Sequence, residues 1–115
     1  MECSKPNIVV ALMDTARADR FSCYGNSRET TPFIDSLADE GTQYEEAYST
    51  SIWSLPAYVS LFNGKLPNEH GTLSWEPGAE NTLIPSLSDY KTLCVSPHLM
   101  GGGWGLVDDF DIHKN

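Results

Sequence analysis

The order of apolar and polar residues along the chain predicts alternating strands and helices. Residues 7–13 (NIVVALM) form a continuous apolar run that is rich in β-branched side chains and ends at Asp14. Such a run is typical of a strand that is buried on both faces at the centre of a parallel sheet. Less apolar strands are expected at 43–49 (QYEEAYS) and at 91–96 (KTLCVS).

Two segments between these strands carry the start and stop signals of helices. In the first, Thr31 is placed as an N-cap, Pro32 takes the first helical position, and Gly41 follows the last apolar turn. A shorter helix is predicted over 55–63, with a proline in its first turn and Gly64 as its stop.

Residues 66–81 are expected to be loop, and the other remaining segments carry weaker signals. Residues 66–81 are rich in proline, glycine and asparagine, and 101–105 (GGGWG) and 107–115 show no period of helix or strand, whereas 82–89 predicts one helical turn. The alternation of strand and helix favours an α/β domain with a mostly parallel sheet and crossover helices. We expect a single domain over 1–115 that forms the first part of a larger sheet.

The composition, 40% hydrophobic and 20% charged, is that of a globular domain rather than a disordered chain. Sixteen acidic against seven basic residues give a net charge of -9, which argues against binding to nucleic-acid phosphates or to an anionic membrane surface. The acidic excess fits either a solvated surface or adaptation to high salt, as in halophiles. The N-terminal residues lack a basic region followed by a long apolar run, so a cytoplasmic location is expected.

Asp14 is the first candidate functional residue. Ligands of open α/β sheets bind beyond the carboxyl ends of the strands, so a carboxylate that ends a buried strand is placed to hold a divalent cation through oxygen. An ordinary turn or cap also explains an aspartate at this position, and both interpretations stay open.

Ser54 stands at or next to the N-cap of the helix predicted over 55–63. The N–H groups and the positive dipole end of a helix N-terminus favour anions, including sulfate and phosphate esters. A hydroxyl at this point is placed to attack such an ester, especially if a metal also ligates it. Plain N-capping by serine is the alternative.

Four further residues are weaker candidates. Arg17 and Lys65 are suited to clamp the oxygens of an anion, and His70 and His98 to act as acids or hydrogen-bond donors. Each of them also fits a solvated or loop position. The segment 101–105 lacks the lysine and the following helix of a phosphate-binding loop, so a flexible turn is expected there.

Three ordered motifs resemble the N-terminal part of the sulfatase family, within the alkaline-phosphatase superfamily. Residues 6–25 (PNIVVALMDTARADRFSCYG) resemble its opening strand, metal-ligand aspartate and CYG turn. Residues 30–49 (TTPFIDSLADEGTQYEEAYS) resemble its TPNLDxLAxEGxxFxNAYS block, and 51–71 (SIWSLPAYVSLFNGKLPNEHG) its nucleophile helix. The similarity is strong over 6–75 and weak over 76–111.

The resemblance implies an alkaline-phosphatase-like α/β fold and metal-dependent hydrolysis of sulfate esters. It implies that Asp14 is a ligand of a divalent cation, often calcium in the family, and that Ser54 occupies the nucleophile position beside that metal. In sulfatases this residue is oxidised to formylglycine, whose hydrate attacks the sulfur and then collapses to release sulfate. Lys65 approximates the family's basic position after the helix. His98, with the leucine that follows it, matches the His-Leu pair of the family's Lys-Trp-His-Leu segment, whose lysine is missing here. Asp14 and Ser54 are then expected to face the same small anion.

Two positions depart from the family pattern. Thr15 stands where a second aspartate is usual, and Tyr58 replaces the arginine of the C/S-x-P-x-R signature. That arginine serves maturation and anion binding, so an unmodified Ser54 acting as in phosphatases or phosphodiesterases of the superfamily is one alternative. A non-catalytic remnant or partner-binding module is another. Family members are several times longer, so we expect this chain to be truncated, marginally stable, and nearly inactive towards a small anionic ester unless a missing C-terminal part completes the site.

Overall fold

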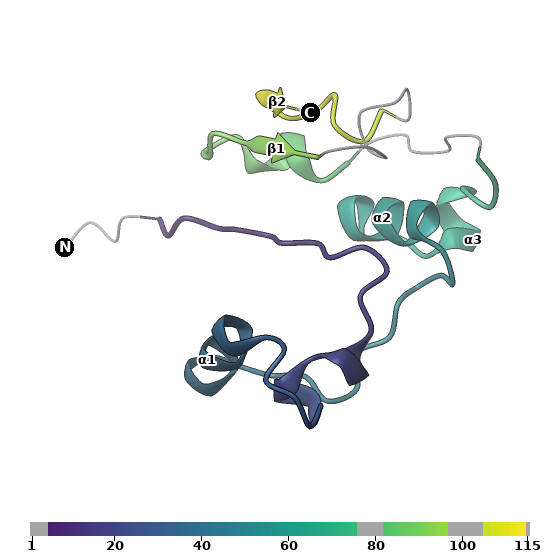
Figure 1. Cartoon of the computed structure of the whole chain (residues 1–115). Helices are drawn as coiled ribbons and strands as arrows, with labels where there is room; N and C mark the ends of the chain where they lie inside the picture. Colours follow the sequence, from purple (N-terminus) through teal and green to yellow (C-terminus); the bar gives the residue numbers. More distant parts are fainter. Residues whose placement is uncertain (1–4, 76–81, 97–104, 115) are drawn as a thin grey trace. The chain divides into compact units, whose positions relative to one another are not determined.

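The computed structural model describes residues 5–75, 82–96 and 105–114 (Figure 1). Contacts between residues divide the chain into two compact units, unit 1 (1–47) and unit 2 (48–115). None of the helices in the described ranges is long and apolar enough to cross a lipid bilayer.

Unit 1 is built from short helices. Two 3-10 turns, η1 (Ala18–Arg20) and η2 (Ser22–Tyr24), precede the α-helix α1 (Pro32–Glu40) (Figure 1). The N-cap of α1 is Thr31 and its C-cap is Gly41, so the predicted bounds of this helix are confirmed.

The side chain of Asp35 ties the start of α1 to η2. Its carboxylate accepts hydrogen bonds from the backbone N–H of Cys23 (2.9 Å) and from the hydroxyls of Ser22 (2.5 Å) and Thr31 (3.0 Å). These bonds, the one from Ser22 most of all, hold the pKa of Asp35 below its usual range. The two elements are therefore joined by polar contacts rather than by a buried apolar core.

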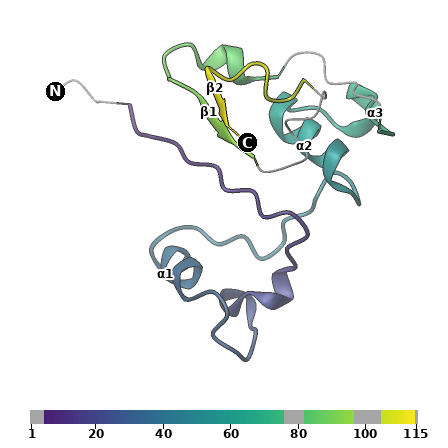
Figure 2. The same ribbon diagram turned by 45° about the horizontal axis from the view of Figure 1, so that its top comes forward.

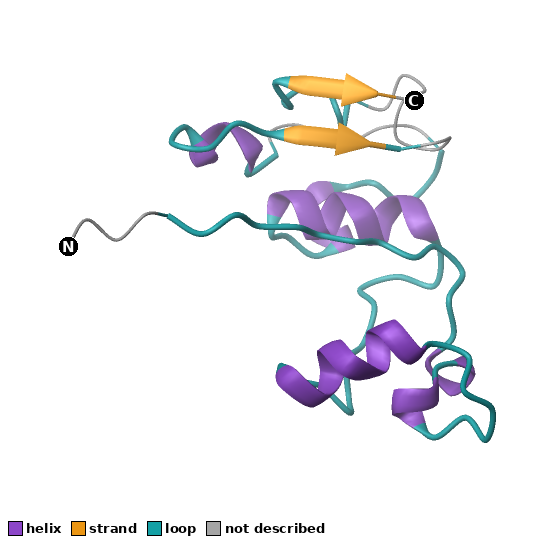
Figure 3. Cartoon of the chain, turned by 60° about the vertical axis from the view of Figure 1, so that its left-hand side comes forward, coloured by secondary structure: helices purple, strands orange, loops and turns teal. Residues whose placement is uncertain are grey.

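The strand predicted over residues 7–13 is not formed. These residues run as an extended segment that is drawn as loop, and no strand in the described part of the chain pairs with them (Figure 3). Val9 is 89% exposed and Val10 is 65% exposed, although the pattern predicted burial on both faces. The prediction is wrong because a strand requires ladder hydrogen bonds to a neighbour, and apolar β-branched residues alone do not supply one.

The strand predicted over 43–49 is also wrong. The backbone there is irregular, and the aromatic rings of Tyr44 and Tyr48 are largely exposed. The carbonyl of Tyr44 instead accepts a hydrogen bond from the hydroxyl of Tyr24 at 2.9 Å. The apolar face of α1 is likewise uncovered within unit 1, with Phe33 74% exposed.

Unit 2 contains the remaining elements, and part of its order was predicted. The helix α2 (Ser54–Asn63), the 3-10 turn η3 (Ile84–Leu87) and the strand β1 (Leu93–Val95) confirm the expected elements. The one-turn helix α3 (Pro67–His70) lies in a segment that was predicted to be loop, so that prediction is wrong. The strand β2 (Ile112–Lys114) lies where no element was predicted.

The strands β1 and β2 form a two-stranded parallel sheet in which Leu93 pairs with Ile112 (Figure 3). At its start, the carboxylate of Asp111 accepts hydrogen bonds from the backbone N–H (2.7 Å) and the hydroxyl (3.0 Å) of Thr92. Both bonds, the first more strongly, lower the pKa of Asp111. The parallel pairing agrees with the predicted α/β class on a small scale. The position of β2 depends on these polar contacts, and a search for hydrophobic periodicity therefore did not detect the strand.

The core of unit 2 lies between α2 and the sheet segment, which Figure 2 shows side by side. Leu55 and Val59 of α2 pack with Cys94 of β1 and with Leu106 and Val107, and all five are buried. Burying a side chain of this size stabilises a protein by about 1.5–3 kcal/mol relative to leaving it exposed. This core therefore fixes the face that α2 turns inward and, with it, the direction of the helix axis.

Candidate functional site

Ser54 is the first residue of α2, directly after the N-cap residue Trp53, whose backbone is extended. The side chain of Ser54 is half-buried. The structure thus places Ser54 one position inside the helix, within the alternatives that the sequence allowed. The indole of Trp53 packs edge-on against that of Trp75, with ring centroids 4.9 Å apart, and it contacts the core of unit 2. This packing fixes the entry of the chain into α2.

The first turn of α2 has an electrostatic feature that suits an anion. N–H groups in the first turn of a helix have no acceptor within the helix, and the dipole gives this end about half a positive charge. The first turns of α1 and α3 contain Asp35 and Glu69, whereas the first turn of α2 contains no acidic residue. The first turn of α2 therefore contains no acidic side chain that would offset the positive end of its dipole.

Tyr58 and Lys65 lie at different distances from Ser54 along α2. Residues four apart on a helix share a face, so Tyr58 lies one turn from Ser54, partly buried against the core. Lys65 is exposed just beyond the other end of α2, and its backbone N–H donates to the side-chain oxygen of Asn63 at 2.9 Å. At a rise of ~1.5 Å per residue, the last residue of α2, Asn63, is about 14 Å from Ser54 along the axis, and Lys65 follows beyond it. The structure therefore does not bring Lys65 close to Ser54.

His70 joins α3 to α2. Its Nδ1 accepts a hydrogen bond from the backbone N–H of Thr72 at 3.1 Å, so in neutral histidine the proton is on Nε2, 3.1 Å from the hydroxyl oxygen of Ser60. Ser60 is 6% exposed and Thr72 is fully buried. Both ring nitrogens are thus engaged inside unit 2, and His70 has a structural role. The sequence offered His70 only as an acid, a donor or a loop residue, and it carried no signal for Ser60 and Thr72.

Asp14 lies in unit 1, on a tight turn after the extended segment. Its carboxylate accepts a hydrogen bond from the backbone N–H of Thr15 at 2.9 Å. Thr15 has a φ of 56°, in the left-handed region that a β-branched residue rarely adopts. Strain of this kind is retained where the surroundings impose it, and it clusters at binding sites.

A divalent cation at Asp14 would require several oxygen ligands. A carboxylate such as Asp14 is the donor type that calcium prefers. Across the described residues, however, no group of three or more histidine, cysteine, aspartate or glutamate side chains is arranged to hold a metal ion. The donor type of Asp14 fits the cation that the resemblance implies, whereas the described residues supply no complete set of such side chains for it. His98 lies outside the described residues, so its expected role stays a prediction.

Comparison with known proteins decides the family. A sequence model described as Sulfatase matches residues 6–97, which is most of the chain. The chain belongs to the sulfatase family. The resemblance of the three motifs is therefore confirmed, and the family's alkaline-phosphatase-like α/β class applies to the segment.

Several curated sulfatases align with this chain. It is 36% identical over 92 residues to an N-acetylgalactosamine-6-O-sulfatase of Bacteroides thetaiotaomicron, and the alignment covers 80% of the chain and 17% of that protein. It is 33% identical over 97 residues to an arylsulfatase of Clostridium perfringens, an alignment that covers 79% of the chain and 20% of that protein. It is 32% identical over 97 residues to an ulvan-active sulfatase of Formosa agariphila, with 84% of the chain and 20% of that protein covered. The chain thus spans about a fifth of the length of these relatives. No solved structure matches it significantly.

Proposed function

We propose that this sulfatase-family segment takes part in the hydrolysis of a sulfate ester, with Ser54 as the residue that meets the sulfur. The observation that supports the proposal is the position of Ser54 at the start of α2, in a first turn without an acidic side chain. An anionic ester held there receives hydrogen bonds from backbone N–H groups and faces the positive end of the dipole. The relatives' names point to sulfated sugars or aryl sulfates as substrates.

The attacking group at residue 54 is either the serine hydroxyl or the hydrate of formylglycine. In both cases an oxygen on the side chain bonds to sulfur while the alcohol leaves with a proton. The hydrate then expels sulfate by collapsing to the aldehyde, whereas a serine sulfate ester requires attack by water. Developing negative charge on the transferred group is stabilised by the same N–H groups throughout.

A divalent cation at Asp14, which we propose to be calcium, would supply positive charge to neutralise the ester oxygens. Asp14 is the one carboxylate that we assign to this ion. Because a calcium ion takes about 6–8 oxygen ligands, we propose that the 115-residue polypeptide assayed alone binds it weakly and has little activity. The roles of Lys65 and His98 at the site, and the expected cytoplasmic location, also stay predictions.

Mass spectrometry of the peptide that contains Ser54 tests which group attacks. Formylglycine lowers the mass of the serine peptide by two hydrogen atoms, and the sulfatase mechanism predicts this loss after coexpression with a maturation enzyme. Tyr58→Arg restores the usual signature, so we expect it to increase the modified fraction, whereas Tyr44→Arg at an exposed position should leave it unchanged. A serine that is unmodified in every variant would favour the phosphatase-type alternative.

Activity measurements test the role of Ser54 itself. We expect any release of sulfate from 4-nitrophenyl sulfate to disappear in Ser54→Ala and to persist in Ser88→Ala, which removes an exposed hydroxyl of the same unit. Turnover that survives in Ser54→Ala would contradict the proposed role. Robust turnover by the polypeptide alone that depends on added calcium would contradict the proposed weakness of its cation site.

A further inference from the structure

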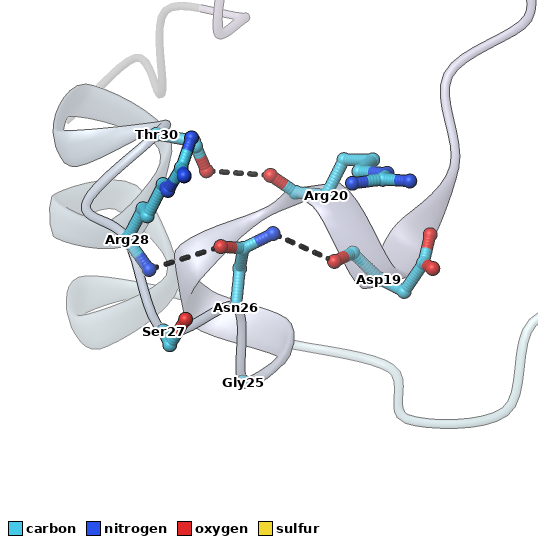
Figure 4. A pocket seen from close by; sticks show the side chains of 7 residues that line it. All are labelled: Asp19, Arg20, Gly25, Asn26, Ser27, Arg28 and Thr30. Atoms are coloured by element: carbon cyan, nitrogen blue, oxygen red, sulfur yellow. Dashed lines mark hydrogen bonds between the residues drawn. The ribbon is translucent and has the colours of Figure 1, made fainter.

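Large apolar side chains are exposed where the chain enters α2. Trp75 is 66% exposed and packs against the N-cap residue Trp53, and Ile52, which precedes Trp53, is fully exposed. Tryptophan side chains are on average highly buried, so an exposed indole is an informative observation. The pocket of unit 1 differs, because polar and charged side chains line it and the guanidinium groups of Arg20 and Arg28 point apart (Figure 4). The aromatic surface at the start of α2 is therefore the better candidate for a ligand contact.

The indole of Trp75 is held in place by packing. It lies edge-on to the indole of Trp53, with ring centroids 4.9 Å apart, and Trp53 in turn contacts the core of unit 2. Three residues before Trp75, Thr72 is fully buried and its backbone N–H donates a hydrogen bond to His70. A side chain that is already fixed loses little conformational freedom when a ligand binds, so this indole is suited to a binding contact.

This aromatic surface adjoins the residue that we propose to meet the sulfur. Trp53 directly precedes Ser54, and consecutive Cα atoms are ~3.8 Å apart. The ring of Trp75 touches that of Trp53, so it lies one side chain away from the start of α2. The core covers the inward face of the helix, which leaves the alcohol part of an ester at Ser54 on the outside. A ring carried by that alcohol can therefore reach the exposed indole.

The chemistry of an exposed indole favours a sugar. The face of an aromatic ring carries partial negative charge. One face of a pyranose presents C–H bonds with partial positive charge, while its hydroxyls lie at the rim and stay in water beside a solvent-facing indole. A wholly apolar aryl ring would instead gain most from an enclosed apolar pocket.

We propose that Trp75 stacks against the pyranose ring of a sulfated sugar and thereby selects sugar esters over small alkyl sulfates. Trp53 supports the indole of Trp75 from below, and the sulfate group lies at the first turn of α2. The proposal rests on the function proposed for Ser54 for the position of the sulfate group, whereas the contact between sugar and indole can be measured separately.

NMR titrations of the 115-residue protein with glucose 6-sulfate and with methyl sulfate separate the ring from the anion. The backbone amides of Ser54 and Leu55 report on the sulfate group, and the indole N–H of Trp75 reports on the sugar. We expect glucose 6-sulfate to bind roughly fivefold more tightly than methyl sulfate, which corresponds to about 1 kcal/mol, and to shift the indole signal. Equal affinities, or an indole signal that does not move, would overturn the proposal.

Variants of Trp75 distinguish a ligand contact from a structural role. Trp75→Leu removes the aromatic face, so it should weaken glucose 6-sulfate roughly fivefold and leave methyl sulfate unchanged, whereas Trp75→Phe should retain most of the difference. Leu66→Ala removes an exposed apolar side chain beyond the other end of α2 and should affect neither ester. Equal weakening of both esters by Trp75→Leu would show that the residue only supports the helix, and it would refute the sugar contact.

The same titrations tell a failure of this proposal from a failure of the function proposed for Ser54. If methyl sulfate shifts Ser54 and Leu55 but the sugar adds no affinity, the sugar contact is refuted and the anion site stands. If glucose 6-sulfate and glucose both shift the indole of Trp75 while Ser54 is spared, the anion site is refuted and the sugar contact stands. Tighter binding of 4-nitrophenyl sulfate than of glucose 6-sulfate, lost in Trp75→Leu, would overturn the choice of a sugar, and no binding of any ester would overturn both proposals.

Discussion

The bridge made by His70 leads to a prediction that separates its two hydrogen bonds. In His70→Ala the buried N–H of Thr72 loses its acceptor and the hydroxyl of Ser60 loses its donor. An unsatisfied buried donor costs about 1–3 kcal/mol, and a lost neutral hydrogen bond costs about 1 kcal/mol. The expected decrease in the free energy of unfolding is therefore about 2–4 kcal/mol. For 68 residues at ~0.05–0.15 kcal/mol per residue, that is a large part of the stability of unit 2.

Two conservative variants divide this loss. In His70→Asn the side-chain oxygen replaces Nδ1 as the acceptor for Thr72, so only the bond to Ser60 is lost and the cost should be about 1 kcal/mol. In His70→Gln the amide nitrogen reaches towards Ser60 but the acceptor for Thr72 is missing, so the cost should be about 1–3 kcal/mol. Asn68→Ala, at an exposed position of α3, is the control and should change stability by less than about 0.5 kcal/mol.

Urea unfolding followed by tryptophan fluorescence measures these differences. All three tryptophans belong to unit 2, so the signal reports on the unit that contains the bridge. We expect the order Ala, then Gln, then Asn, from the largest loss of stability to the smallest. A glutamine variant that is more stable than the asparagine variant would show that the assigned tautomer and the bond to Thr72 are wrong.

Three further predictions concern other parts of the chain. Asp35 has a lowered pKa in the folded state, so its contribution to stability is present above its unfolded pKa and is lost as the pH falls through the folded value. The amide signal of Cys23, followed by NMR, should therefore decline at acid pH, and this decline should be smaller in Asp35→Asn. Thr15→Asn should raise the melting temperature by relieving about 1 kcal/mol of left-handed strain, and a lower melting temperature would show that threonine is favoured there. Leu106→Ala should cost about 2–5 kcal/mol in urea unfolding, against less than about 1 kcal/mol for Leu61→Ala at a half-exposed position of α2, and equal losses would deny that Leu106 is at the core.

The sequence predicted the elements whose signals are local. The bounds of α1 follow from Thr31, Pro32 and Gly41, and the end of α2 follows from Gly64, which adopts a φ of 72° at the C-cap. These signals depend on the backbone preferences of single residues and need no distant partner. The motif order was enough to identify the family, because three motifs in the expected order are more specific than any one of them.

The elements that the sequence did not predict depend on contacts between distant residues. Residues 7–13 have the composition of a buried strand, but strand formation requires a neighbouring strand, which no local pattern specifies. The strand β2 (Ile112–Lys114) has three residues, too few to show a period, and its position depends on the bond from Thr92 to Asp111 and on pairing with β1. At the candidate site, the position of Ser54 followed from Pro56 and was found, whereas the bridging role of His70 depends on two residues in other segments.

The most direct test of the proposed function is whether a sulfate ester binds at the N-terminus of α2. Amide signals of the 115-residue protein should be followed during titration with 4-nitrophenyl sulfate, in the wild-type protein and in Ala57→Asp, which places an acid in the first turn. Because an acidic side chain would occupy the positive end of the dipole, we expect saturable shifts at Ser54 and Leu55 that weaken strongly in Ala57→Asp. Shifts that spare Ser54 and Leu55, or that are equal in the two proteins, would contradict it.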